Sequence, residues 1–134
     1  MGRGTSQSGG GSQDASSETT TRRQRYKSGL AAERTAAIWL FLKGYVVLGA
    51  RVRTPAGEID LIATRGKRIA FVEVKRRRTL ELAEASVTAK QRQRTRHAAD
   101  LWLAKHPRYQ EHTIGFDLIF LLPWHLPIHL PNAL

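Results

Sequence analysis

The chain has 134 residues and no cysteine, and its 22 Lys and Arg residues against 11 Asp and Glu residues give a formal net charge of +11. The absence of cysteine excludes disulfides and thiolate metal sites and favours a reducing, cytoplasmic location. No apolar run approaches the about 20 residues that cross a bilayer, and the first residues lack the apolar segment of a secretory signal, so we expect no membrane association. So large a positive excess favours a nucleic-acid partner over a basic surface that only aids solubility.

The first 21 residues are rich in Gly, Ser, Thr and Gln and almost free of apolar side chains. Such a segment cannot bury enough surface to offset the entropy of ordering it. We therefore predict a disordered tail over residues 1–24 and one folded domain over residues 25–134. Residues 1–21 hold one Arg and two acids, which leaves 21 basic and nine acidic residues to the rest of the chain. The positive charge thus belongs to the domain.

The first predicted helix covers Leu30–Lys43 and ends at Gly44. Leu30, Ala37, Leu40 and Phe41 are expected to share its buried stripe. Its one acid, Glu33, stands in the first turn, where spacing alone favours an interaction with the helix dipole.

A strand is predicted next, over Tyr45–Arg53, followed by a turn at residues 54–57. The register of this strand against the following one is left open by the sequence. A three-residue loop places Val52 opposite Asp60, whereas a four-residue loop places Arg51 there.

Residues 58–76 form the most informative stretch of the chain, because apolar and polar residues alternate on both sides of Gly66-Lys67. This pattern predicts a two-stranded hairpin, and Gly in the first position of a two-residue loop suits a type II′ turn. Counting back from the loop places Asp60 opposite Glu73, and Glu58 opposite Lys75. Like charges directly opposed destabilise a sheet, so a divalent cation is expected to offset the repulsion.

Paired carboxylates supply the hard oxygen ligands that Mg²⁺ or Mn²⁺ prefer. Such an ion lowers the pKa of bound water and stabilises charge on a phosphodiester during hydrolysis. Lys75 follows Glu73 by two residues and points to the same side of the strand, where it can position water or pair with phosphate. The alternative is a surface ladder in which Glu58 and Lys75 form an exposed ion pair of little energetic value.

After the hairpin a basic run, Arg76–Arg78, leads into a loop rich in Glu and Ala. Thr88 is predicted to cap a second helix that ends near Lys105. The first half of this helix pairs Lys90 with Arg94, and Arg92 with Arg96, at i,i+4 spacing. Because like charges at this spacing destabilise a helix, the pattern favours contact with phosphate over a merely solvated face. Residues 113–122 are expected to form another strand, and the Pro-interrupted residues 123–134 a short edge strand or tail.

An ordered set of motifs resembles the PD-(D/E)xK nuclease superfamily, and within it the small YraN-type family of predicted endonucleases, likened to Holliday junction resolvases. Asp60, followed after twelve residues by Glu73-Val74-Lys75, matches the superfamily core. The matching pieces are Gly29–Ala32 with Glu33, Gly57–Ile62, Phe71–Lys75, Ser86–Thr88 with Lys90–Arg92, and Phe116-Asp117.

The resemblance implies an α/β fold, with a mixed β-sheet flanked by helices around a restriction-endonuclease-like core. It implies that Asp60 and Glu73 bind the metal ion and that Lys75 is the catalytic lysine. Glu33 matches a first-helix glutamate that reaches the metal or its waters, which reverses the interpretation from spacing alone. Lys90 and Gln91 match positions that face the substrate, and Arg76, Arg77, Arg92 and Arg94 are expected to bind phosphates.

Two positions depart from the family pattern. Ile59 stands where the superfamily name has Pro, which is common. Gly115 stands where Arg is expected before Phe116-Asp117, so a phosphate contact from that position is lost.

The function expected from residues and resemblance together is a Mg²⁺- or Mn²⁺-dependent endonuclease that hydrolyses DNA, with branched or structured DNA as the substrate. Resolution of a four-way junction would require a symmetric homodimer. The alternatives are a non-catalytic nucleic-acid-binding module on a nuclease scaffold, and a protein-interaction partner whose basic face binds an acidic protein. Phosphate-binding Arg and Lys do not by themselves distinguish DNA from RNA.

Overall fold

A computed structural model describes residues 29–134. The tail predicted over residues 1–24 and the domain boundary after it lie outside the described residues. The chain divides into two compact units, residues 1–31 and 32–134, and the second contains all the elements discussed below except the start of the first helix.

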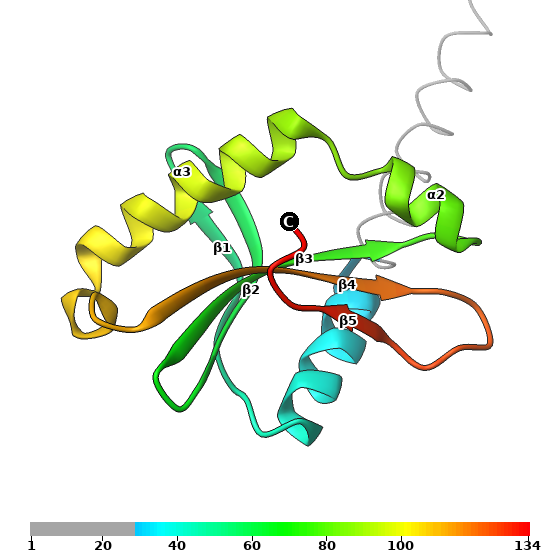
Figure 1. Cartoon of the computed structure of the whole chain (residues 1–134), viewed down its shortest axis with the longest axis horizontal. Coiled ribbons are helices and arrows are strands. Elements are labelled where there is room, and N and C mark those ends of the chain that lie inside the picture. Colours follow the sequence, from blue (N-terminus) through cyan, green and yellow to red (C-terminus); the bar gives the residue numbers. More distant parts are fainter. Residues whose placement is uncertain (1–28) are drawn as a thin grey trace, which may run out of the picture. The chain divides into compact units, whose positions relative to one another are not determined.

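The second unit is built on a five-stranded sheet with the strand order β1-β2-β3-β4-β5 (Figure 1). The strands are β1 (Val46–Thr54), β2 (Gly57–Arg65), β3 (Arg68–Arg76), β4 (Thr113–Leu121) and β5 (Ile128–Leu130). Neighbouring strands are antiparallel except β3 and β4, which are parallel. The predicted α/β fold with a mixed sheet flanked by helices is therefore confirmed.

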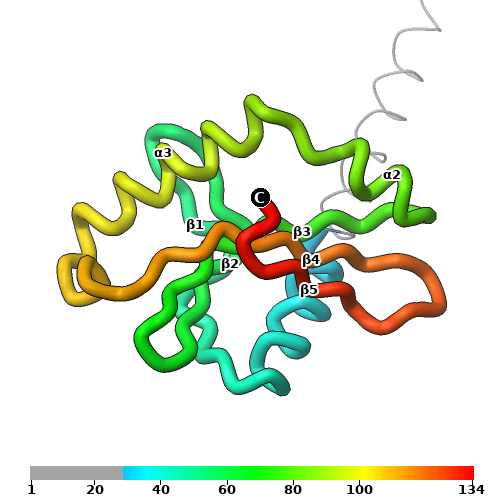
Figure 2. Tube along the Cα trace, in the orientation of Figure 1, coloured from blue at the N-terminus to red at the C-terminus, as the bar shows by residue number. Residues whose placement is uncertain are grey.

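The parallel pair requires a long crossover, which the chain makes through helical elements between β3 and β4. These are α2 (Leu80–Ala85), α3 (Ala89–Lys105) and a 3₁₀ turn, η1 (Pro107–Tyr109). The tube view follows this path from green through yellow to orange (Figure 2). Thr88 caps α3 as predicted, its hydroxyl accepting from the Gln91 N–H at 3.1 Å.

The first helix covers residues 29–42 and is followed by Gly44 with φ +90°. Ala32, Ala36 and Leu40 form its buried face at i,i+4 spacing, and the small alanines allow a close approach to the sheet. Leu40 is buried as predicted, but Phe41 is 70% exposed, so its place in the predicted stripe was wrong. The helix buries the Ala32–Ala36–Leu40 row, and Phe41 lies about 100° around the helix from Leu40.

The two faces of the sheet are covered by different helices. Along β3, Ala70 and Val72 pack with the first helix, whereas Ile69 and Phe71 pack with α3. The first helix and α3 lie on opposite sides of the strands in Figure 1. A central strand buried on both faces is expected to be continuously apolar, as Ile69–Val72 is.

Both hairpins have two-residue loops. Arg65 pairs with Arg68 around Gly66-Lys67, and Gly66 has φ +60°, which confirms the predicted hairpin and agrees with a type II′ turn. Thr54 pairs with Gly57 around the other loop. Ala50 pairs with Leu61 and Val52 with Ile59, which places Arg51 across from Asp60. This is the register predicted for a four-residue loop. The loop itself is two residues shorter, because Thr54 and Gly57 also pair.

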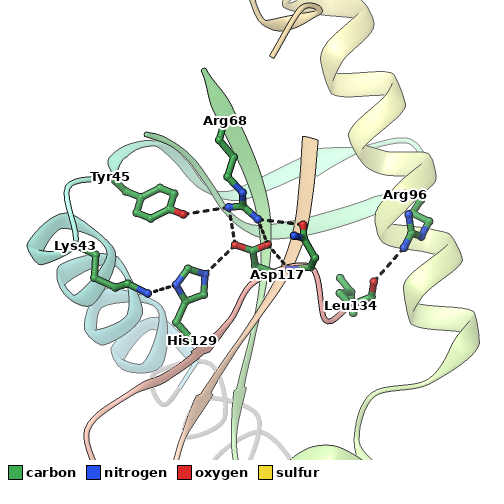
Figure 3. A network of polar contacts seen from close by, with 8 residues as sticks. Lys43, Tyr45, Arg68, Arg96, Asp117, His129 and Leu134 are labelled. Carbon is green, nitrogen blue, oxygen red and sulfur yellow. Dashed lines mark hydrogen bonds and ion pairs between the residues drawn. The ribbon is translucent and has the colours of Figure 1, made fainter. Parts of the chain in front are cut away.

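Asp117 of β4 is fully buried at the centre of a polar network (Figure 3). The guanidinium of Arg68 donates two hydrogen bonds to its carboxylate, at 2.7 and 2.9 Å, and His129 Nε2 lies 2.8 Å from it. Lys43 contacts the other ring nitrogen of His129, and Tyr45 accepts from Arg68. The network joins the end of the first helix, the central strands and β5.

The same network explains Gly115. A Cβ at this position would overlap the guanidinium of Arg68, so β3 supplies an arginine side chain where the family pattern expects one from β4. Burial would raise the pKa of Asp117, but hydrogen bonds from His129 and Arg68 and from the Asn132 N–H outweigh it and lower that pKa to about 2.

Candidate functional site

The candidate site begins where the β2–β3 ladder ends. Main-chain pairing runs from Arg65–Arg68 to Leu61–Val72, and the next residue of β2 is Asp60. The Asp60 carboxylate accepts a hydrogen bond from the Val74 N–H at 2.8 Å. At this point a hydrogen bond from a side chain to the main chain therefore joins β2 and β3. A carboxyl group is thereby held beside β3, close to Glu73.

Glu73 is 8% exposed and lies beneath the first turn of α3. Its Oε1 accepts a hydrogen bond from Gln91 Nε2 at 2.6 Å and lies 3.6 Å from Lys75 Nζ. Alternation along β3 places Glu73 and Lys75 on one side, and the Thr88 cap places Gln91 above them. The structure therefore brings together four of the residues expected at the site: Asp60, Glu73, Lys75 and Gln91.

Glu58 does not pair with Lys75 as the extended register predicted. It pairs with Arg53 of β1, with 3.9 Å between Arg53 Nε and Glu58 Oε2. Lys75 is instead turned to Glu73 and is only 9% exposed, which excludes the exposed Glu58–Lys75 ladder.

Burial disfavours the charged form of both carboxyl groups. Burial and then the neighbouring Asp60 carboxylate raise the pKa of Glu73 to about 7, and Lys75 and Arg94 only partly offset this. Burial likewise raises the pKa of Asp60, against the Val74 hydrogen bond, the charge of Lys75 and a hydrogen bond with Glu73. More positive charge is needed to keep both groups ionised at neutral pH.

The residues present fit a divalent ion. Asp60 and Glu73 are hard oxygen donors, and Gln91 Oε1 beside them is buried without a hydrogen-bond donor in the part of the chain described. Within residues 29–134 no three His, Asp or Glu side chains converge as a ready metal-binding group. Mg²⁺ is commonly bound by one or two protein carboxylates with water completing its shell, so the Asp60–Glu73 pair is a sufficient protein contribution.

Glu33 is buried but turned elsewhere. Its Oε2 lies 2.7 Å from Arg51 Nε, and the side chain is 10% exposed. Burial raises the pKa of Glu33, the hydrogen bond from Arg51 lowers it, and Asp60 and Glu58 raise it further, so the three acids are neighbours. The structure thus places Glu33 near the site but pairs it with Arg51.

Arg51 was not predicted as a site residue. It has φ +50°, a left-handed conformation that is uncommon for residues other than Gly, Asn and Asp. No motif identifies such a position; the one signal was the four-residue loop register, which placed Arg51 opposite Asp60.

Among the residues predicted to bind phosphate, Arg94 is the one whose charge acts on Glu73. A Cβ on Gly57 would lie 2.9 Å from Arg94 Cδ and 3.0 Å from its Cγ, so the arginine stem crosses the β1–β2 turn where that glycine leaves room. Its charge lowers the pKa of Glu73. The other predicted phosphate-binding residues are exposed around this centre: Arg76, Arg77, Lys90 and Arg92.

Fold and site together define an α/β protein whose five-stranded mixed sheet is compatible with a restriction-endonuclease-like core and carries a half-buried and a buried carboxylate side by side. The chain belongs to the Uncharacterised protein family UPF0102, whose model matches residues 32–121.

Curated relatives agree with this membership. A UPF0102 protein of Nitrobacter winogradskyi is 48% identical over 108 residues, 81% of this chain and 92% of the relative. A UPF0102 protein of Methylorubrum extorquens is 47% identical over 112 residues, 84% of this chain and 88% of the relative. One of Rhodopseudomonas palustris is 45% identical over 108 residues, 81% of this chain and 80% of the relative. Membership of the small YraN-type family is confirmed, whereas the assignment to the PD-(D/E)xK superfamily stays a prediction, because the family name states no activity.

No helix within residues 29–134 is both long and apolar enough to cross a membrane.

Proposed function

We propose that the protein is a metal-dependent endonuclease that hydrolyses phosphodiester bonds of DNA, with branched or otherwise structured DNA as its substrate. The observation that carries the proposal is the half-buried Asp60 beside the buried Glu73, with Lys75 Nζ 3.6 Å from Glu73 Oε1. Two acids and a lysine in this order match the PD-(D/E)xK pattern. An exposed ion-pair ladder would not bury Glu73 and Lys75.

Asp60 and Glu73 would hold Mg²⁺ or Mn²⁺, which when bound supplies an acidified water and positive charge to offset the phosphate. Gln91 Nε2 holds the Glu73 carboxylate in place through the 2.6 Å hydrogen bond. Gln91 Oε1 supplies an acceptor for a water proton. Lys75, as a donor at a nearly dry position, orients water or a phosphate oxygen.

Phosphate binding is assigned to the basic residues around this centre. Arg94 crosses Gly57 and is directed by the turn toward Glu73, so it suits a phosphate close to the bond that is cut. Four further basic residues are exposed and suit phosphates further along the DNA strand: Lys90 and Arg92 of α3, Arg76 at the end of β3, and Arg77 directly after it.

The test is cleavage of a panel of labelled duplex, nicked, flapped and four-way DNAs with Mg²⁺ or Mn²⁺. The wild-type protein is expected to cut at least one. Asp60→Asn, Glu73→Gln and Lys75→Ala should each lower the rate by about 10²-fold or more. Glu58→Gln is the matched control, because Glu58 is a nearby acid paired with Arg53 outside the proposed ligand set. Absence of cleavage, or equal rates in all variants, would contradict the proposal.

The second candidate is a nucleic-acid-binding module without catalysis. It is favoured by the Glu33–Arg51 pair, which leaves two acids rather than three for a metal ion. It predicts strongly salt-dependent DNA binding that neither Mn²⁺ nor Glu73→Gln changes. Binding isotherms in EDTA and in Mn²⁺ distinguish the two.

A further inference from the structure

Arg51 and Glu33 form a pair that the proposed reaction does not use. The ion pair is short, 2.7 Å from Arg51 Nε to Glu33 Oε2, and the two side chains are 25% and 10% exposed. Arg51 Nη1 also lies 4.0 Å from Glu58 Oε1. One guanidinium therefore lies between two acids, beside the Asp60–Glu73 pair.

The main chain at Arg51 is part of this arrangement. Its φ of +50° is unfavourable for an arginine, and the shift in β1 register between Val47 and Gly49 lies just before it. Left-handed residues other than glycine persist where surrounding contacts hold them, and they gather at functional sites. One contact that holds Arg51 is its ion pair with Glu33.

Because Arg51 lies across from Asp60, its ion pair with Glu33 is formed next to the proposed metal site. Glu33 is near enough to Asp60 for their charges to interact, but its Oε2 is held by Arg51. Glu33 is thus a third carboxylate close to the proposed metal site, but it is already paired with a positively charged side chain, that of Arg51.

We propose that Arg51 is a built-in counter-cation that competes with the divalent ion for Glu33 and so sets the affinity of the metal site. The inference rests on the proposed metal site at Asp60 and Glu73. In the metal-free protein Arg51 neutralises Glu33 and allows the cluster of acids to stay packed. A divalent ion that recruits Glu33 must displace Arg51, which weakens its binding.

The experiment is calorimetric titration of Mn²⁺ into the full-length protein. Arg51→Asn removes the cation and suits the left-handed backbone, since Asn tolerates positive φ. It is expected to tighten Mn²⁺ binding by about tenfold, the effect of a typical coupling between contacting residues. Arg51→Lys keeps the charge and should stay close to wild type.

Glu33→Gln separates competition for Glu33 from a general effect of charge. Alone it should change the affinity less than about threefold, because Arg51 already occupies Glu33, but in the Arg51→Asn protein it should abolish the gain. Arg53→Asn is the matched control, a neighbouring arginine that is 91% exposed and should change little. Thermal unfolding verifies that each variant is folded, and Arg51→Gly replaces Arg51→Asn if it is not.

Three results would overturn the inference: unchanged affinity in Arg51→Asn, a gain that persists in the double variant, or a large loss in Glu33→Gln alone. Failure of the metal site itself is recognised separately. In that case the wild-type protein takes up no Mn²⁺, or Asp60→Asn takes it up equally well.

Discussion

At the scale of single residues, the surroundings of Glu73 differ from those of a surface acid. Glu73 is buried beside the half-buried carboxylate of Asp60 and has Lys75 and Gln91 as partners. A carboxyl group whose pKa is raised by folding binds its proton more tightly in the native than in the unfolded protein. It therefore favours folding below its ordinary pKa, and stability falls as the pH rises from 4.5 toward 7.

This predicts the pH dependence of the metal-free protein. In EDTA, Glu73→Gln should raise the free energy of unfolding at pH 8 by a few kcal/mol at most and change it little at pH 4.5. Urea denaturation across this range measures both. Glu58→Gln should not reproduce the effect, and an equal change at both pH values would show that the titration of Glu73 is not its cause.

The residues of the site differ in how far sequence alone could identify them. Asp60, Glu73 and Lys75 follow from a two-residue loop, because the loop fixes which side chains are opposite. Gln91 follows only from resemblance, since a hydrogen bond between a helix and a strand has no local signal. Arg51 and the passage of Arg94 over Gly57 depend on positive φ and on packing between distant segments, which no local pattern encodes.

At the scale of elements, the β1–β2 turn and α3 are in contact through Gly57 and Arg94. Gly57 has φ +139°, and the stem of Arg94 comes within 2.9 Å of the position that a Cβ would take. The turn thus has two reasons to use glycine, the backbone conformation and the space for Arg94. Gly57 thereby affects where Arg94 lies, and Arg94 is one of the residues of α3 proposed to bind phosphate.

Gly57→Ala is accordingly expected to weaken DNA binding through Arg94. Arg94→Ala should lower the affinity and reduce the salt slope by about one. Gly57→Ala should lower the affinity similarly, but have little further effect in the Arg94→Ala protein. Fluorescence anisotropy in EDTA at several salt concentrations measures this cycle. Additive losses would mean that Gly57 acts independently of Arg94.

The start of α3 offers a second prediction. Thr88→Ala removes the hydroxyl that accepts the Gln91 N–H and should cost about 1 kcal/mol of stability, while Thr88→Ser should retain most of it. Thermal unfolding checks both. A loss in Thr88→Ser equal to that in Thr88→Ala would argue against capping.

The elements were mostly predictable because their signals are local. Gly44, Gly66 and Thr88 mark ends that the structure confirms. The short helix α2 was taken for a loop, since six residues are too few to show a helical period, and Leu80 and Leu82 are exposed. The buried face of the first helix was misjudged because alanine gives a weak hydrophobic signal.

At the scale of the whole described unit, Asp117 connects segments far apart in the chain. Through Arg68, His129 and Lys43 it links β3, β4, β5 and the end of the first helix (Figure 3). Asp117 lies on the face of the sheet that the first helix covers, and Glu73 lies on the face that α3 covers. The network supports the scaffold without using the candidate site.

Asp117→Asn should therefore affect stability and not metal binding. Breaking a buried ion pair by removing one partner costs about 3–5 kcal/mol, because Arg68 is left without its counter-ion. Urea denaturation measures the loss, and Mn²⁺ affinity below the unfolding transition should equal that of wild type. A stable Asp117→Asn protein, or one with altered Mn²⁺ affinity, would contradict this division of roles.

The central claim is that Asp60 and Glu73 form a divalent metal site, and calorimetric titration with Mn²⁺ tests it most directly. We predict that the wild-type protein and Glu58→Gln bind the ion alike. Asp60→Asn and Glu73→Gln should lose at least about tenfold in affinity, since each removes a charged ligand. Binding that is absent from the wild-type protein, or equal in all four proteins, would contradict the claim.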